Sequence, residues 1–330
     1  MEHSTLVLFF AAVVAVAILI YVILDGADLG VGILFGTTRD EHERDQMIAA
    51  IAPFWDGNET WLIVVATVLF AAFPAVYAVF LSAFYLPVVL LLVGLIFRGV
   101  AFEFRSRSAR LRSIWDLGFW LGSAVVAFVQ GAAVGAMIQG IPVTGGQYSG
   151  GAFAWLAPFP VLCGVGLAIG YALLGASWLV LKSEAALRER AYRLVPWLAG
   201  AMVVLLAIAS GATLGIADRI ASQLAGRLWG LVFPLAGVLA VAGILIGVRR
   251  RRDGWPFAMT AVFFLMAFLT LAVLFWPYMI PYALTITDTA APEASLSFLF
   301  WGTIVILPVV LAYTIAVYWI FRGKLRRSYS

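Results

Sequence analysis

The sequence predicts an all-α polytopic membrane protein that crosses the membrane about nine times. Of its 330 residues, 64% are hydrophobic and only 12% are charged, about half the charged share of an ordinary soluble domain. The mean hydropathy is +1.04, and the apolar residues occur in long uncharged runs. Such runs are typical of transmembrane helices, which need roughly 20 consecutive apolar residues.

Nine apolar runs define the expected spans within one transmembrane domain, residues 1–330. Each run is long enough to cross a bilayer as a helix, and short polar loops separate them. Pro53 suits the first turn of the second span, because a proline lacks the N–H that is unpaired there. An alternative is a helix that starts near Gln46 and kinks at Pro53. The expected spans are 6–35, 53–73, 76–104, 114–140, 153–181, 195–217, 228–248, 255–280 and 296–321.

The basic residues alternate between the two ends of these spans. Of the 21 lysines and arginines, 18 follow spans 1, 3, 5, 7 and 9. Arg219 and Arg227 lie on the opposite side, and Arg98 lies within the third span. Cytoplasmic loops carry an excess of basic residues, so we expect the N-terminus outside and the C-terminus in the cytoplasm. The pI near 9.3 follows from these loops and does not indicate nucleic-acid binding.

Seven charged residues lie inside or at the ends of spans 1 to 4, toward the expected cytoplasmic side. They are Asp25, Asp28, Asp56, Glu59, Arg98, Glu103 and Asp116. Asp25 and Asp28 share one helical face, as do Asp56 and Glu59, because each pair is three residues apart. Charges in hydrocarbon are costly and usually face a bundle interior or a water-filled cavity. One arginine cannot neutralise six acids, so we expect protonated, paired or cation-bound carboxylates, an arrangement that suits a proton relay.

Structural roles compete with this interpretation. Glu103 and Asp116 stand at span ends, where an acid can reach interfacial water. Asp56 and Glu59 also suit a helix N-terminus, whose dipole favours negative charge. Arg98 is expected to be a structural counter-ion for the embedded acids.

Glycines and aromatic residues near these acids have packing interpretations. Gly26 and Gly30 are four residues apart, a spacing that lets helices approach closely. Trp55 and Trp61 flank the acid pair in W-D-G-N-E-T-W and are candidates for a quinone or partner contact. The alternative is that both tryptophans have packing roles or belong to the aromatic belt at the membrane surface. The same belt explains Tyr318, which stands near a span end.

Histidine and cysteine are nearly absent from the sequence. The two histidines, His3 and His42, lie outside the expected spans, and Cys163 is the single cysteine. A haem held within this chain would therefore lack its commonest axial ligand. We expect neither haem nor metal in this chain, and no phosphate-binding glycine motif indicates a nucleotide-driven pump.

Several motifs together resemble subunit II of the cytochrome bd quinol oxidases. W-D-G-N-E-T-W is the most specific of them, and the resemblance runs nearly end to end, although residues 140–280 are similar only in hydropathy. The chain is short for the family, which suggests a cyanide-insensitive or otherwise divergent branch. The motifs are L-D-G-A-D-L-G-V-G-I-L (24–34), I-A-P-F-W-D-G-N-E-T-W-L (51–62), F-Y-L-P…F-R-G-V-A-F-E-F-R (84–105), W-D-L-G-F-W-L-G-S (115–123), P-Y-A-L-T-I-T-D and L-P-V-V-L-A-Y-T-I-A-V-Y-W-I-F-R.

The resemblance implies a fold of two four-helix bundles plus one peripheral helix. It also implies a heterodimer in the bacterial inner membrane, in which a haem-carrying subunit I holds haems b and d and the quinol site. The complex oxidises quinol and reduces O2 to water with protons from the cytoplasm. A small accessory subunit, membrane lipids and a bound quinone are compatible with this assignment.

The resemblance implies that the family's proton pathway includes Asp25, Asp56 and Glu103. Some relatives have aspartate in place of Glu103. Asp28 and Glu59 lie in the same motifs and are expected to take part. Two alternatives stay open at this point. One is an ion- or proton-coupled secondary transporter, and the other is a structural subunit whose acids bind a fixed cation.

Overall fold

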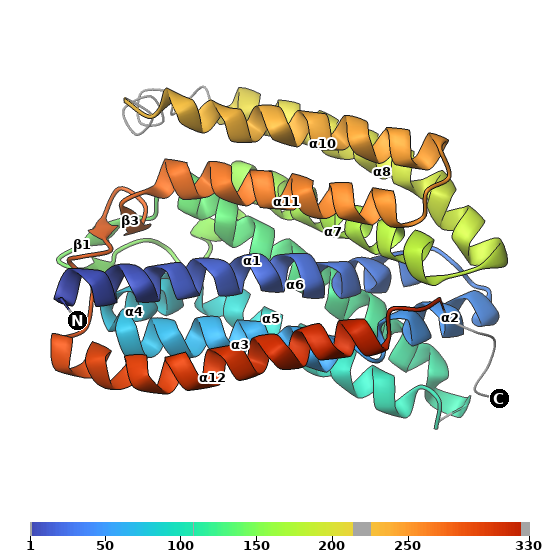
Figure 1. The fold of residues 1–330 in the computed structure, drawn as a ribbon, viewed down its shortest axis with the longest axis horizontal. Coiled ribbons are helices and arrows are strands. Elements are labelled where there is room, and N and C mark those ends of the chain that lie inside the picture. Colours follow the sequence, from blue (N-terminus) through green and yellow to red (C-terminus); the bar gives the residue numbers. More distant parts are fainter. Residues whose placement is uncertain (1, 108, 214–225, 325–330) are drawn as a thin grey trace.

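The computed structural model describes residues 2–107, 109–213 and 226–324, and most of them are helical. The long helices run side by side along the longest axis of the molecule (Figure 1). Two short hairpins, β1–β2 (Val143–Thr144 and Gln147–Tyr148) and β3–β4 (Tyr278–Ile280 and Leu284–Thr285), lie at the end that holds the N-terminus. The short helix α2 (Glu41–Ile51) lies at the opposite end.

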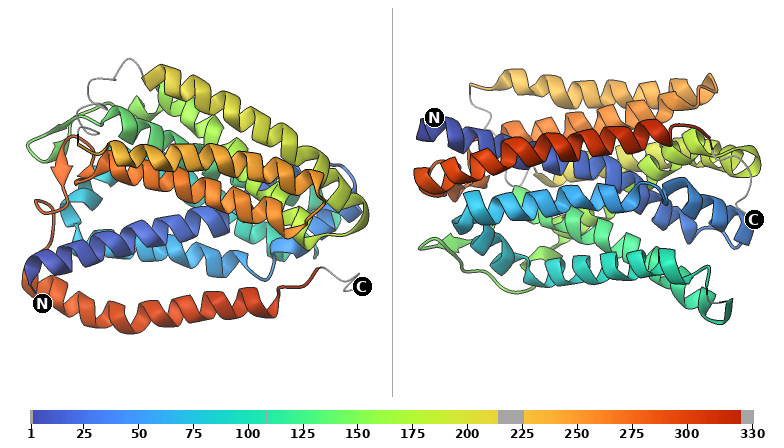
Figure 2. Two further views of the ribbon diagram at one scale, coloured as in Figure 1. Left: turned by 45° about the horizontal axis from the view of Figure 1, so that its top comes forward. Right: turned by 60° about the horizontal axis from the view of Figure 1, so that its bottom comes forward.

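The long helices form two groups of four and one outer helix. The first group packs α1 against α3 and α6, and α6 against α5; the second joins α7, α8, α10 and α11. Helix α12 contacts α1 and α3 and lies on the outside of the bundle (Figure 2). The bounds are α1 His3–Phe35, α3 Trp55–Ala72, α4 Pro74–Ala83, α5 Tyr85–Phe104, η1 Ala109–Leu111, α6 Arg112–Gln139, η2 Ala154–Leu156, α7 Pro158–Lys182, α8 Ala185–Ala212, η4 Leu228–Leu231, α10 Val232–Arg249, α11 Gly254–Phe275 and α12 Glu293–Ile320.

This architecture confirms the expected all-α membrane fold of two four-helix bundles and a peripheral helix. Within the described ranges, eight helices are long and apolar enough to cross a membrane, so the predicted number of about nine is approximate. Helix α3 is not among the eight, although it has 18 residues, because its first two turns hold the polar W-D-G-N-E-T sequence.

Two span predictions are wrong where prolines interrupt the chain. The span expected over 76–104 is divided at Phe84, because Pro87 has no N–H to bond to the Ala83 carbonyl one turn earlier. Pro53 lies in the turn between α2 and α3, outside the first helical turn where we expected it. The alternative of one helix kinked at this proline is also wrong, since α2 ends at Ile51.

Two other helices differ from their expected ranges. Helix α8 begins at Ala185, ten residues before the apolar run over 195–217, because its charged first turns extend the helix beyond that run. Residues 214–217 of this span, and Arg219, lie outside the described residues. Helix α11 ends at Phe275, and part of the expected span 255–280 forms β3 instead.

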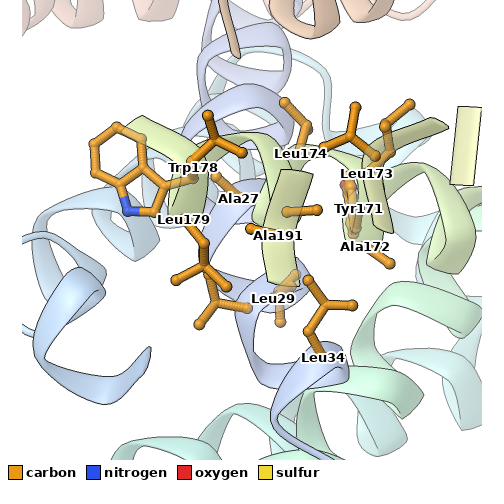
Figure 3. Packing of buried hydrophobic residues seen from close by; sticks show 14 of the residues in the cluster. Ala27, Leu29, Leu34, Tyr171, Ala172, Leu173, Leu174, Trp178, Leu179 and Ala191 are labelled. Carbon is orange, nitrogen blue, oxygen red and sulfur yellow. The ribbon is translucent and has the colours of Figure 1, made fainter. Parts of the chain in front are cut away.

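Helix α1 approaches α7 very closely at the predicted glycine pair. A Cβ added to Gly30 would lie 1.7 Å from the carbonyl oxygen of Tyr171, and one added to Gly26 would lie 2.6 Å from the Tyr171 ring. Gly175 faces the same contact from α7. The close-packing interpretation of this spacing is therefore confirmed. Figure 3 shows α1 and α7 side chains interleaving here with Ala191 of α8.

We predict that Gly30→Ala lowers the stability of the folded protein by about 3 kcal/mol or more, because neither backbone can move aside easily. The same substitution at Gly200, an exposed position of α8 with no atom within 4 Å of an added Cβ, is the matched control. It should be neutral or slightly stabilising. Thermal unfolding of the purified protein measures both. Equal melting temperatures for the two variants would contradict the close contact.

Candidate functional site

Arg98 on α5 is the centre of a buried ionic cluster. Its side chain is fully buried, and its Nη2 atom lies 2.7 Å from Asp25 Oδ1 and 3.8 Å from Asp28 Oδ2. Its Nη1 atom lies 3.3 Å from Glu59 Oε1. An arginine keeps its charge even when buried, so it needs anionic partners inside the protein. The structure thus brings together four of the residues that the sequence predicts for the site.

Three helices of the first bundle position this cluster. Helix α1 continues without a break past Asp25 and Asp28, which therefore project from one face as their spacing predicts. Helix α3 begins at Trp55, so Glu59 falls in its second turn, beside the α1 acids. Arg98 stands near the end of α5 and reaches both helices.

Asn58 and Tyr318 complete the site, and neither is predicted from the sequence to belong to it. Asn58 is buried and donates a hydrogen bond from Nδ2 to Asp28 Oδ2 at 2.7 Å. The Tyr318 hydroxyl of α12 lies 3.1 Å from the same Asn58 nitrogen. Asn58 could have been identified from the sequence as a member of the site, because it stands between the two acids of W-D-G-N-E-T-W. The partnership with Tyr318 spans 260 residues of sequence and had no such signal.

The acids of the site differ in their access to the surface. Asp56, at the start of α3, is exposed, and the Glu59 side chain is 22% exposed. The Asp28 side chain is 2% exposed and that of Asp25 is fully buried. The series therefore leads from the surface at one end of the bundle to a charge pair in its interior. Carboxylates graded in this way can exchange protons between water and a buried site.

Two further acids lie apart from this cluster. Glu103, which is expected in the same pathway, is 63% exposed and lies 3.2 Å from Arg107. It follows Arg98 by five residues, which turns it about 140° around the helix and onto another face. Asp116 pairs with Arg105, whose Nε atom lies 2.5 Å from Asp116 Oδ1 at the base of α6.

The two tryptophans of the motif make packing contacts within the chain. Trp55 stacks on Phe102 with ring centroids 4.7 Å apart and an interplanar angle of 7°. Trp61 is buried, and its Nε1 atom donates to Thr314 Oγ1 of α12 at 3.3 Å. These contacts favour the packing interpretation, and the quinone or partner contact stays a prediction.

The described residues form no cluster of side chains that would hold a metal ion. No group of three or more histidine, cysteine or acidic side chains among them is arranged to hold a metal. His3 lies in the first turn of α1, and His42 is exposed on α2 beside Gln46. The His3 Nδ1 atom is buried at the end of the bundle that holds the N-terminus, and the His42 ring lies on the surface.

The end of α12 is tied to the second bundle, which holds Tyr318 over the site. The Lys182 ammonium donates to the Phe321 carbonyl oxygen. Lys324 and Arg188 each approach Asp253 at 2.6 Å, and the Tyr192 hydroxyl donates to Asp253 at 2.7 Å. Partial burial would raise the pKa of Asp253, but these hydrogen bonds outweigh it and lower the pKa to about 2.

A family model described as cytochrome bd terminal oxidase subunit II matches residues 6–321. The chain belongs to this family. It is therefore a multi-pass membrane component of a cytochrome bd-type oxidase, and the family implies haems in the complex and a partner subunit I. The expected resemblance and the expected oxidase role are confirmed. Because the chain belongs to this family, it is better described as an oxidase subunit than as an ion-coupled transporter, although its composition is compatible with both.

Relatives that match over nearly their whole length support this membership. Subunit 2 of the cytochrome bd-I ubiquinol oxidase of Escherichia coli K12 is 30% identical over 99% of this chain and 97% of its own length. Subunit 2 of the cytochrome bd ubiquinol oxidase of Bacillus subtilis is 30% identical over 94% of each chain. The fold matches a chain in the structure of the bd oxidase from Geobacillus thermodenitrificans with a TM-score of 0.78, at 18% identity over 96% of this chain and 98% of that one.

We predict that Asp253→Asn lowers the free energy of unfolding by about 1–2 kcal/mol near neutral pH, because it removes the charged acceptor at the end of α12. A lowered pKa means that the ionised Asp253 stabilises the fold above its unfolded-state pKa near 4. This contribution is lost as the pH falls from about 4 toward 2. Thermal unfolding at several pH values measures it. A difference between wild type and variant that does not shrink in acid would contradict the assignment.

Proposed function

We propose that this chain is the haem-free subunit II of a bacterial cytochrome bd-type quinol oxidase, located in the cytoplasmic membrane. In this proposal it supports the haem-bearing subunit I and provides buried carboxylates for proton uptake. The haem-free role is supported by the scarcity of histidine, the commonest axial ligand: the sequence has only His3 and His42, and neither lies within an expected span. The quinol substrate is suggested by the ubiquinol oxidase names of the relatives from E. coli and B. subtilis.

The graded exposure of the acids around Arg98 carries the proton-uptake proposal. Asp56 is at the surface, Glu59 is partly buried, and Asp28 and Asp25 are inside. Reduction of O2 to water consumes protons, which must reach a haem buried in the membrane. A row of carboxylates that share one counter-ion lets protons move inward without a lone charge entering hydrocarbon.

The direction of uptake follows from the proposed topology. Most basic residues lie at the end of the bundle that holds α2 and the end of α12, and Asp56 and Glu59 open toward that same end. The positive-inside rule places this end in the cytoplasm. Protons consumed there and protons released from quinol on the other side would charge the membrane without a pump. Glu103 is left out of the proposed path, because it lies on a separate exposed face.

Purification of the tagged chain from its native membrane tests the assignment. We expect a haem-bearing partner to co-purify, with b and d bands in the reduced-minus-oxidised spectrum and quinol-driven oxygen uptake. A haem-free assembly of this chain alone, without oxygen uptake, would contradict the proposed function.

Asp56→Asn should slow quinol-driven oxygen consumption several-fold, because the surface acid that collects protons for Glu59 is removed. Haem content and assembly should stay intact, since Asp56 is exposed. Glu184→Gln is the matched control, because Glu184 is also an exposed acid beside a helix N-terminus at the same end of the bundle. Unchanged turnover in a fully assembled Asp56→Asn complex would remove this acid from the path.

A further inference from the structure

A tight turn of four successive arginines, residues 249–252, joins α10 to α11 at the same end of the molecule as α2 (Figure 1). The Arg251 N–H donates to the Val248 carbonyl oxygen at 3.1 Å, and the next N–H, of Arg252, donates to Gly247 at 3.1 Å. Two such bonds close a helix around a left-handed residue, which is usually glycine. Here that residue is Arg251, with a φ of 53°. The backbone conformation therefore does not explain why arginines occupy this turn.

The acids at this turn already have partners. Arg251 Nη1 lies 2.6 Å from Glu189 Oε2 of α8, which fixes the turn against its neighbouring helix. Asp253, the residue after the four arginines, pairs with Arg188 and with Lys324. Neither Glu189 nor Asp253 makes a contact within 4 Å with the other arginines of the turn in the described part of the chain.

Arg250 and Arg252 line a small cleft between α10 and α11. They share it with Ile246, Gly247 and Trp255. Both arginines are exposed, and among the described residues neither guanidinium makes an ion pair or a hydrogen bond. The cleft thus holds two positive charges and no negative charge of its own. Such a basic cleft at the cytoplasmic end of membrane helices is typical of a site for a phosphate-bearing headgroup.

The wall and the surroundings of this cleft suit a lipid. Trp255 is fixed, because its Nε1 atom donates to the Gly243 carbonyl oxygen at 3.0 Å and its ring lies over Gly247, where an added Cβ would be 2.4 Å away. Above the cleft, α10 presents an apolar stripe, because positions three, four and eleven residues apart share one helical face. Its exposed side chains are Leu235, Val238, Leu239 and Ile246.

We propose that this cleft binds the phosphate of an anionic phospholipid, with Arg250 and Arg252 as its ligands and the acyl chains along the apolar stripe of α10. Guanidinium groups bind phosphate oxygens through paired, charge-assisted hydrogen bonds. The positive-inside rule places this turn at the cytoplasmic leaflet, where anionic lipids attract basic residues. A zwitterionic lipid fits less well, because the cleft has no acid to receive its ammonium group. This site is separate from the acids around Arg98 and does not depend on the proposed proton uptake.

A second cleft at the same end of the molecule lacks this property. It is lined by Arg44 and Asp116, together with Trp120 and other residues of α1 and α6. Arg44 Nη1 lies 2.8 Å from Asp116 Oδ2, so its guanidinium is already paired. The comparison shows that an arginine beside a tryptophan is not sufficient, and that the free charge distinguishes the cleft between α10 and α11.

Phosphatidylglycerol binding to the delipidated, purified oxidase complex tests the proposal. Native mass spectrometry counts the lipids that stay bound, and thermal unfolding measures the stabilisation. We expect the Arg250→Gln/Arg252→Gln variant to bind phosphatidylglycerol about tenfold or more weakly than the wild type, because each arginine near an anionic headgroup contributes to the affinity. The rise in melting temperature that the lipid causes in the wild type should largely disappear. Haem spectra and oxygen uptake should be unchanged, since both side chains are exposed.

Arg110→Gln/Arg249→Gln is the matched control. It removes the same two charges from exposed positions at the same end of the molecule but outside the cleft, and it should bind phosphatidylglycerol like the wild type. Equal losses in the two double variants would mean diffuse attraction and would overturn the site. Equal stabilisation of the wild type by phosphatidylcholine would show that the charge of the lipid is not recognised. Equal stabilisation by inorganic phosphate alone would assign the cleft to a free anion and refute the lipid.

Discussion

The burial of one arginine side chain imposes the main constraint on this protein. Arg98 cannot lose its proton and has no access to water, so carboxylates from other helices must surround it. Removal of one partner from such a pair costs about 3–5 kcal/mol, because the remaining charge stays buried. Asp25, Asp28 and Glu59, each costly in a membrane helix alone, are stabilised together by this guanidinium.

Close helix packing gives the cluster its asymmetry. Contact between Gly30 and the Tyr171 backbone brings α7 against α1 and closes the inner side of the site. On the outer side, Tyr318 of α12 reaches Asn58, and the end of α12 is held by Asp253 and its partners. Glu59 alone of the three clustered acids keeps appreciable exposure. The site is therefore open toward one end of the bundle, as one-sided proton uptake requires.

Much of this arrangement can be predicted from sequence, because it depends on local rules. Apolar runs indicate the helices, and the three-residue spacing of Asp25 and Asp28 indicates a shared face beside the single embedded arginine. The sequence also indicates that Glu103 lies on another face of its helix than Arg98, because the two are five residues apart. The motif resemblance, in contrast, places Glu103 in the same proton pathway as Asp25 and Asp56. The break at Phe84 and the polar start of α8 do not follow, because hydropathy does not mark where a helix divides or extends beyond the membrane. The Asn58–Tyr318 bond depends on tertiary packing alone.

We propose that protons for O2 reduction enter through the acids around Arg98. Time-resolved proton uptake by the fully reduced purified complex after mixing with O2 tests it most directly, with a pH-sensitive dye and with haem spectra recorded in the same experiment. In Glu59→Gln we expect proton uptake about tenfold slower than in wild type, with unchanged haem content and O2 binding. Proton uptake at the wild-type rate in this variant would show that the protons do not pass through these acids.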